Sequence, residues 1–276
     1  SPADQQLAVA GISSDLGNPF LPVDGMYTLL VAGSSANPGT LDYQFLVADL
    51  SEARGTPAGF GDLRSGTLTA TQTNQFTLTG YAGQWFALDS QDRNTSVVID
   101  LRAPPGTGTP ILTVNAGQDS VPYVLPLSGV YTLSVRGTGA YRFRLLDLSA
   151  APALPLNPDR TVALAAPFQT DVYRLPATAG QRYYYDAIDA DQDAVTVRLW
   201  DPTGTRLLVS QNSDFDFGPL LAGLNGTYYV MVESGLATAT DYRFRFLDYS
   251  ALPVLPLNTL VTTPLASGKI SSAYRF

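Results

Sequence analysis

The sequence contains no cysteine and no histidine among its 276 residues. Without cysteine the chain forms no disulfide and offers no thiol nucleophile. Without histidine it lacks the most common general base, the Ser-His and Cys-His nucleophile pairs, and histidine-ligated zinc. These absences remove most catalytic arrangements, and we expect that the protein is not an enzyme.

Two charged residue types are almost missing as well. Lys269 is the single lysine, and Glu52 and Glu233 are the only glutamates, so Asp and Arg carry nearly all of the charge. The formal net charge of −8 disfavours contact with a phosphate backbone, and we expect no nucleic acid partner. No apolar run approaches the roughly 18 residues that a membrane-spanning helix requires, so we expect no membrane insertion within this segment.

An internal repeat is the strongest feature that the sequence does contain. The segment Tyr141-Arg-Phe-Arg-Leu-Leu-Asp147 recurs about 100 residues later as Tyr242-Arg-Phe-Arg-Phe-Leu-Asp248. Leu-Pro-Leu-Asn follows the two copies at 154–157 and 255–258, and a weaker copy lies at 43–49. Repetition at this period predicts a tandem array of similar domains.

Other segments keep the same period. Gly25-Met-Tyr-Thr-Leu-Leu-Val31 matches both Gly129-Val-Tyr-Thr-Leu-Ser-Val135 and Gly226-Thr-Tyr-Tyr-Val-Met-Val232. Near the end of the chain, Tyr274-Arg-Phe276 matches Tyr173-Arg-Leu175. These matches define the boundaries of the successive repeats.

These boundaries divide the chain into four parts. Residues 1–52 match the second half of a repeat, 53–150 and 151–251 are complete repeats, and 252–276 match the start of a further one. We therefore expect the chain to be a piece of a longer array. The proline-rich segments between repeats favour extended, semi-rigid backbone, so the array should be stiff.

The repeated segments have the pattern of β-strands. In 141–147, aromatic and aliphatic residues alternate with Arg142 and Arg144, as in a half-buried antiparallel strand. Turn motifs such as Asp201-Pro-Thr-Gly204 and Asn225-Gly226 separate such strands. The sequence predicts an all-β fold of tandem antiparallel jelly-roll or β-sandwich domains, each of about 100 residues.

The second complete repeat resembles the bacterial pre-peptidase C-terminal (PPC-like) domains. The resemblance is carried by Thr170-Asp-Val-Tyr-Arg-Leu175, Ala179-Gly-Gln181, Val197-Arg-Leu-Trp-Asp-Pro-Thr-Gly204, Gly226-Thr-Tyr-Tyr-Val-Met-Val232 and Asp241-Tyr-Arg-Phe244. It implies a jelly-roll β-sandwich in an exported, non-catalytic module of a secreted or cell-surface protein. The first complete repeat departs from the pattern, because Ala103-Pro-Pro-Gly106 replaces Asp-Pro-x-Gly.

An acidic cluster is the candidate metal site. It consists of Asp186, Asp189, Asp191 and Asp193. Several carboxylates in one loop suit Ca²⁺, but Ala194 and Trp200 stand where an EF-hand loop needs Gly and Glu. Two interpretations stay open: a calcium site of another kind, and a solvated acidic turn that protects a strand edge.

Aromatic residues form the candidate carbohydrate contact. By alternation along their strands, the outward-facing rings are those of Trp85, Trp200, Tyr184 and Tyr229. Such rings stack on sugars in a binding module, whereas in a structural array they pack between domains.

Two sets of repeated polar residues have structural interpretations. Asp49, Asp147 and Asp248 each end a strand two residues before a serine, where the carboxylate can cap the following turn. Arg142, Arg144, Arg243 and Arg245 should pair with acids across strands or cover a neighbouring domain.

These observations favour a structural or adhesive repeat segment of a larger secreted or cell-surface bacterial protein, such as part of an extracellular fibre or layer. Its partners would be neighbouring repeats of the same chain, identical chains or surface glycans. Two alternatives stay open, namely a carbohydrate- or calcium-dependent binding module and an accessory domain of a secreted hydrolase.

Overall fold

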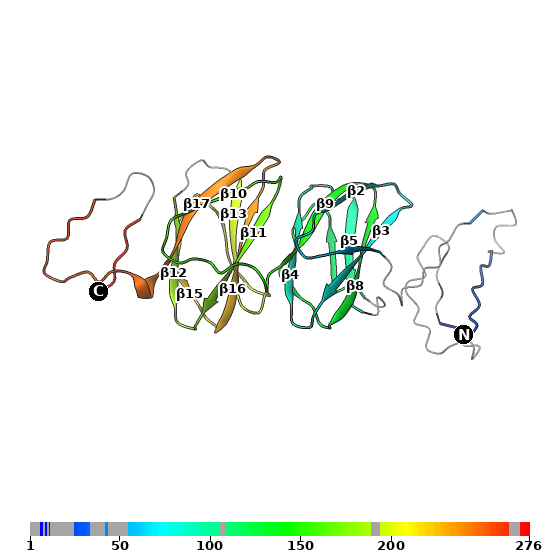
Figure 1. The fold of residues 1–276 in the computed structure, drawn as a ribbon, viewed down its shortest axis with the longest axis horizontal. Coiled ribbons are helices and arrows are strands. Elements are labelled where there is room, and N and C mark those ends of the chain that lie inside the picture. Colours follow the sequence, from blue (N-terminus) through cyan, green and yellow to red (C-terminus); the bar gives the residue numbers. More distant parts are fainter. Residues whose placement is uncertain are drawn as a thin grey trace.

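In a computed structural model of the chain, the described residues are 6–7, 9, 11, 25–33, 42–43, 55–104, 109–188, 194–264 and 271–276. Two β-sandwiches lie one after the other along the long axis of the molecule, with the chain's two terminal segments at opposite ends (Figure 1). Among the described residues no helix has the length and hydrophobicity needed to cross a bilayer.

The described residues of the first sandwich form nine strands in two sheets. They are β1 (Thr56–Ala58), β2 (Arg64–Leu68), β3 (Thr73–Gly80), β4 (Trp85–Ser90), β5 (Val97–Arg102), β6 (Leu112–Asn115), β7 (Tyr123–Val124), β8 (Gly129–Gly137) and β9 (Gly139–Asp147). The sheet orders are β1-β3-β8-β5-β6 and β2-β9-β4-β7. Apart from the parallel edge strand β1, all pairing is antiparallel.

The second sandwich repeats this arrangement without the extra edge strand. Its strands are β10 (Arg160–Leu164), β11 (Thr170–Ala177), β12 (Arg182–Ala187), β13 (Val195–Trp200), β14 (Leu207–Asn212), β15 (Phe217–Leu221), β16 (Gly226–Ser234) and β17 (Thr240–Asp248), and a 3₁₀ turn, η1 (Tyr249–Ala251), follows. The orders β10-β17-β12-β15 and β11-β16-β13-β14 match those of the first sandwich strand for strand. This order is that of an eight-stranded jelly roll, so the predicted fold class is confirmed.

Alternation along the strands builds one core within each sandwich. In β9 the inward side chains of Tyr141, Phe143 and Leu145 are buried in the first core. In β17 their counterparts Tyr242 and Phe244 are buried in the second. Because the period-two pattern also directs the intervening arginines outward, each strand contributes to two surfaces: a core and an outer sheet face.

The loop before strand β8 or β16 is fixed in the same way in both repeats. The Tyr131 hydroxyl contacts the backbone N–H and C=O of Leu127, and the Tyr228 hydroxyl contacts those of Leu224. A buried hydroxyl thereby gains partners, and the loop is held against the sandwich edge.

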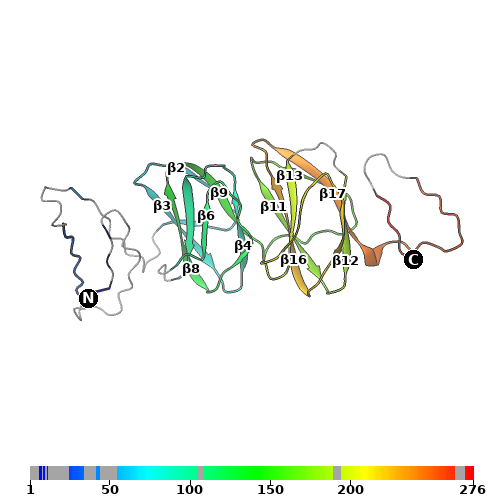
Figure 2. The same ribbon diagram turned by 180° about the vertical axis from the view of Figure 1, so that it is seen from behind.

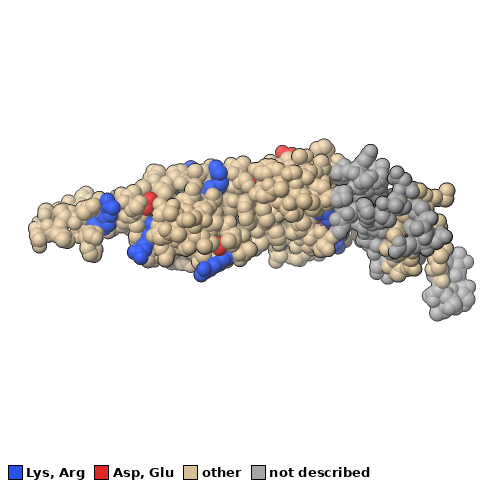
Figure 3. Space-filling view, turned by 90° about the horizontal axis from the view of Figure 1, so that it is seen from below, with Lys and Arg blue, Asp and Glu red and all other residues tan. Residues whose placement is uncertain are grey.

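The four sheets follow one another along the molecule. Strands β4 and β9 of the first sandwich lie beside β11 and β16 of the second (Figures 1 and 2). The outer face of β2-β9-β4-β7 therefore meets the outer face of β11-β16-β13-β14. On the face seen in Figure 3, charged side chains are sparse and scattered.

Candidate functional site at the junction between repeats

The contact between the two sandwiches has an apolar centre that is separate from both cores. Ala87 and Leu148 of the first repeat are fully buried against Trp200, Tyr229 and Met231 of the second. Burial of these side chains stabilises one relative placement of the repeats by the ordinary hydrophobic effect. The junction is thus packed in the manner of a domain core.

Two further contacts complete this apolar centre. The ring centroids of Trp85 and Tyr229 are 5.9 Å apart, within the range of attractive aromatic pairs. Trp85 also lies against Gly204 in the Asp-Pro-Thr-Gly turn of the second repeat, so closely that a Cβ atom at Gly204 would collide with its ring. The turn that sequence comparison singled out is therefore part of the junction.

Beside the apolar centre, a polar cluster of the first repeat holds the first residue of β11. The Thr170 amide donates to Asp89 Oδ1 at 3.1 Å, and its carbonyl accepts from Arg144 Nη2 at 2.9 Å. The Thr170 hydroxyl donates to Asp119 Oδ2 at 3.1 Å. Arg144 and Asp89 also form an ion pair. We call Asp89, Asp119 and Arg144 the clamp.

The same clamp recurs at the end of the second sandwich. The Ser271 amide donates to Asp186 Oδ1 at 3.0 Å, and its carbonyl accepts from Arg245 Nη2 at 2.6 Å. The Ser271 hydroxyl donates to Asp216 Oδ2 at 3.2 Å. Asp186, Asp216 and Arg245 therefore form a second clamp, which holds Ser271 as the first clamp holds Thr170.

Each clamp is also fixed to its own repeat. Asp119 Oδ1 accepts from the Ser90 amide at 2.6 Å, and Asp216 Oδ1 accepts from the Ala187 amide at 2.7 Å. One carboxylate oxygen thus binds the clamp's own sandwich, while the other binds the segment that follows it in the chain. Because every group has its partner, the buried polar contact is specific in geometry.

Burial and neighbouring charge raise the pKa of the carboxyl groups at the first junction. Burial raises the pKa of Asp89, and the Arg144 guanidinium opposes the change. For Asp119, burial together with the Glu233 and Asp89 carboxylates raises the pKa to about 7. Burial raises the pKa of Glu233 as well, opposed by Arg198. The junction thus gathers acids from both repeats.

An arginine adds a further contact at the rim of this junction. The Arg93 guanidinium lies 4.0 Å from the centre of the Phe168 ring, and its Nη2 donates to the Ser234 carbonyl at 3.4 Å. Both partners belong to the second repeat. This cation–π contact extends the interface beyond the clamp.

The linkers pair with the strand that the clamp holds. Arg174 N donates to the Pro152 carbonyl at 2.9 Å, and Leu154 N donates to the Arg174 carbonyl at 2.7 Å. Arg275 makes the same parallel bridge with the segment around Val254. These hydrogen bonds tie each proline-containing linker to the segment that the clamp holds.

Of the candidate calcium cluster, the structure describes Asp186 alone. Asp186 is fully buried in the second clamp, where it pairs with Arg245. Asp189, Asp191 and Asp193 lie outside the described residues. Within the part of the chain that is described, no group of acidic side chains has the arrangement of a metal site. Calcium binding stays a prediction.

The candidate carbohydrate residues divide between two places. Trp200 and Tyr229 face outward from their own sheet, but the first repeat covers them, and Trp85 of the first repeat is partly buried against Tyr229. Tyr184 lies on the outer face of the other sheet, and its hydroxyl donates to Asp216. Three of the four rings therefore pack between repeats, which is the structural interpretation that the sequence left open.

The structural interpretations hold for Arg144, Arg243, Arg245, Asp147 and Asp248, whereas Arg142 donates to the Gln91 side chain and not to an acid. Arg144 and Arg245 pair with acids on neighbouring strands, and Arg243 pairs with Asp159. Asp248 accepts from the Ser250 amide at 2.8 Å, as expected for a turn cap. The Ala150 amide donates to Asp147 in the same way. Asp49 lies outside the described residues.

Sequence reasoning missed the clamp as a unit. Asp89 and Asp119 received no role, and Thr170 was noted only within the segment that resembles PPC-like domains. The available signal was the conservation between repeats of an acid at the end of β4 and β12, an acid before β7 and β15, and a hydroxyl at the start of the next repeat. The repeats reveal this set only when contacts across their boundary are considered.

The fold and junction define a class, namely tandem jelly-roll repeats joined by a recurring directional interface. No protein-family model matches the sequence, and no curated protein matches it. Among solved structures, the CUB1-EGF-CUB2 domains of rat MASP-1 share 7% identity at a TM-score of 0.23, covering 70% of this chain and all of that one. The corresponding human MASP-1/3 domains share 10% identity at a TM-score of 0.21, covering 67% of this chain and 99% of that one.

The full extracellular region of zebrafish Gpr126/Adgrg6 is also similar, with 11% identity and a TM-score of 0.21. The match covers 79% of this chain and 42% of that one. Similarities of this size carry no functional argument.

Proposed function

We propose that the chain is a non-catalytic, structural or adhesive repeat segment of a larger secreted or cell-surface bacterial protein. Its role is to hold successive jelly-roll domains in one relative orientation. The observation that carries this proposal is the clamp, which occurs at the end of both sandwiches and binds the amide, carbonyl and hydroxyl of Thr170 in one case and of Ser271 in the other. A site that is built twice around the segment following each sandwich supports a role in assembling an array.

The composition of the junction supports the same role. Trp200 and Tyr229 are among the aromatic residues best suited to bind a sugar, but both are buried between repeats. Interfaces between domains that move are usually small and polar, whereas this junction combines an apolar centre with a buried ion pair between Arg144 and Asp89. Export is part of the proposal because the strand and turn motifs resemble PPC-like domains.

The proposal is tested by measuring how rigidly the two sandwiches are placed. Spin labels on cysteines at Leu127 and Leu224, which are exposed and equivalent in the two repeats, report one distance across the junction. We expect a narrow distance distribution in the full chain. Replacing Asp89 and Asp119 by Ala should broaden it, whereas Asp241→Asn, at an exposed site outside the junction, should not.

A distribution that is already broad before any clamp residue is changed would contradict the proposal. It would mean that the sandwiches move independently in solution. In that case the protein would be a chain of flexibly linked binding modules instead of a rigid support.

A further inference from the structure

The two sandwiches carry residues of different size at one position of the outer sheet face that bears the clamp, which we call the end of a sandwich. Strand β4 places Ala87 there, and β12 places Tyr184, each two residues before the first clamp acid, Asp89 or Asp186. Ala87 is fully buried in the apolar centre of the junction. The two ends therefore differ in size at a position that the first junction uses for packing.

The Tyr184 ring is held in place on the second end. Its hydroxyl donates to Asp216 Oδ2 at 3.0 Å. Its ring lies so close to Gly218 that a Cβ atom at Gly218 would collide with it. The counterpart of Gly218, two residues after the clamp acid of the first sandwich, is Val121. One end thus has Tyr beside Gly, and the other has Ala87 with Val121.

The opposite outer faces, which we call the fronts, also differ between the sandwiches. On the front of β11-β16-β13-β14, Tyr229 and Met231 of β16 are buried against the first sandwich. At the same positions of β8, the front of β1-β3-β8-β5-β6 has Thr132 and Ser134, which are buried as well. One front is therefore large and apolar where the other is small and polar.

An ion pair on each front has the opposite polarity. Arg198 of β13 pairs with Glu233 of β16 on the second front. On the first front, Asp100 of β5 occupies the position of Arg198, and its partner on β8 is Arg136. Glu233 is near enough to Asp119 of the clamp to raise its pKa, whereas a front of the first kind would present a cation there. The fronts thus differ in charge as well as in size.

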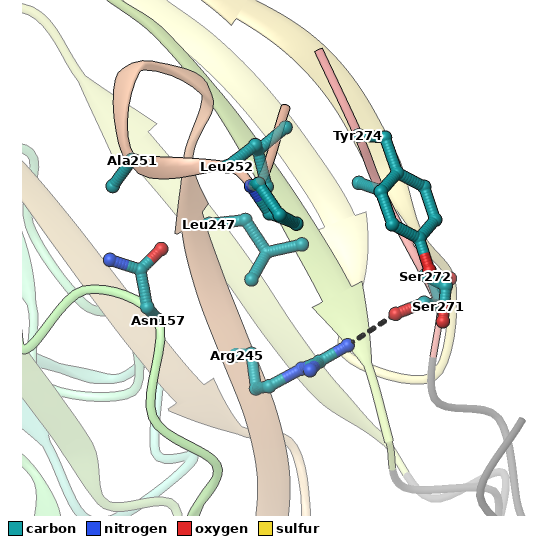
Figure 4. A pocket seen from close by; sticks show the side chains of 10 residues that line it. Asn157, Arg245, Leu247, Ala251, Leu252, Ser271, Ser272 and Tyr274 are labelled. Atoms are coloured by element: carbon teal, nitrogen blue, oxygen red, sulfur yellow. Dashed lines mark hydrogen bonds between the residues drawn. The ribbon is translucent and has the colours of Figure 1, made fainter. Parts of the chain in front are cut away.

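The segments that the two clamps hold show the same contrast. Val172, two residues after Thr170, packs against the apolar centre of the first junction. Its counterpart two residues after Ser271 is Ala273, which lines a cavity of about 270 Å³ beside Leu247 (Figure 4). The end with the larger residue therefore holds a segment with a smaller one.

We propose that the residue at the position of Ala87 and Tyr184 determines which front each end accepts. An end with Ala accepts a front with large apolar residues at the positions of Tyr229 and Met231. An end with Tyr accepts a front with small polar residues there, as on the first sandwich. Because packed interiors have no room for an additional ring, a wrong combination either overpacks the junction or leaves a cavity in it.

Rejection of wrong neighbours would fix the order of the repeats along an array, since specificity depends on the cost of the wrong contact. The inference rests on the proposed array function, because it assumes that neighbouring sandwiches are packed rigidly against one another. It adds to that function a rule for which repeat can follow which.

An exchange of end residues in the full chain tests this rule. Ala87→Tyr together with Val121→Gly gives the first sandwich the end of the second. The exchange should broaden the distance distribution between the spin labels and lower the midpoint of thermal unfolding by at least about 4 °C, because the ring overpacks the junction. Tyr229→Thr with Met231→Ser should also lower this midpoint in the otherwise unchanged chain, because it leaves a cavity.

The combined variant distinguishes a specific match from general damage. When both exchanges are made, the new ring meets small residues, so the narrow distribution and most of the lost melting temperature should return. Tyr184→Ala, on the second end, is the matched control and should leave the distance across the first junction unchanged. A narrow distribution after the end exchange alone, or a combined variant no better than that exchange, would overturn the inference. The unchanged chain would still report a rigid junction, so the proposed function would stand.

Discussion

Asp119 is the junction residue whose protonation should most strongly change stability. It lies between its own repeat, through the Ser90 amide, and the next repeat, through the Thr170 hydroxyl. Replacing it with Asn keeps the size of the side chain and an oxygen that accepts from Ser90. The amide removes the charge and mimics the protonated acid.

The sign of the pH effect follows from the two pKa values. The ordinary pKa of an Asp side chain is 3.8, and burial beside Glu233 and Asp89 raises that of Asp119 to about 7. Between these values the folded protein holds a proton that the unfolded chain has lost. The free energy of unfolding contributed by this group is therefore fully present below about pH 4 and is lost as the pH rises through about 7.

The magnitude follows from the same difference. Each pKa unit corresponds to about 1.4 kcal/mol, so the loss between pH 4 and pH 8 is at most about 4 kcal/mol. Asp119→Asn should therefore be close to wild type in stability at pH 4 and more stable than wild type at pH 8. Glu233→Gln should give part of the same gain, because it removes one of the charges that raise the Asp119 pKa.

The assay is urea unfolding of the full chain at a series of pH values, followed by tryptophan fluorescence, since Trp85 and Trp200 both lie at the junction. Asp241→Asn, which removes one charge from an exposed site outside the junction, corrects for net charge. The reasoning is refuted if Asp119→Asn and wild type differ by the same amount at pH 4 and pH 8, or if the variant is less stable at pH 8.

Three further predictions are tested by urea unfolding and thermal melts. Gly204→Ala should destabilise by about 1–3 kcal/mol more than Gly180→Ala, because both glycines have positive φ but only Gly204 lies against Trp85; equal effects would contradict this contact. Thr170→Val should lower the free energy of unfolding by about 1 kcal/mol, because it removes the hydroxyl that donates to Asp119. Thr170→Ser keeps this hydroxyl and should lower the free energy of unfolding much less. The opposite order of the two variants would contradict the clamp. Asp186→Asn should lower the melting temperature equally with calcium and with chelator, because Asp186 supports the second clamp; an effect confined to calcium would favour the metal site.

The strand pattern could be predicted because it depends on local alternation. Tyr141 and Phe143 had to face a core, and Arg144 had to face away from it, wherever the strand lay. The turn Asp201-Pro-Thr-Gly204 was visible for a similar reason, since proline and glycine restrict the backbone locally. These features require no knowledge of the neighbouring repeat.

The junction could not be predicted in the same way, because its partners are distant in sequence. Asp186 was grouped with the acids that follow it along the chain, yet its ion-pair partner is Arg245 on another strand. Trp200 was correctly placed on an outer face, but sequence alternation cannot show that Ala87 and Leu148 cover that face. Side-chain direction is local information, whereas burial between domains is not.

The clamp binds Thr170 mainly through its backbone groups. Asp89 and Arg144 bind the N–H and C=O of Thr170, which every residue except proline supplies, and only Asp119 requires a hydroxyl. A duplicated or exchanged repeat could therefore join the array with little adjustment, provided that it began its first long strand with Ser or Thr and kept the apolar residues equivalent to Trp200, Tyr229 and Met231. Such a connector allows the array to change in length during evolution while each new boundary remains well packed.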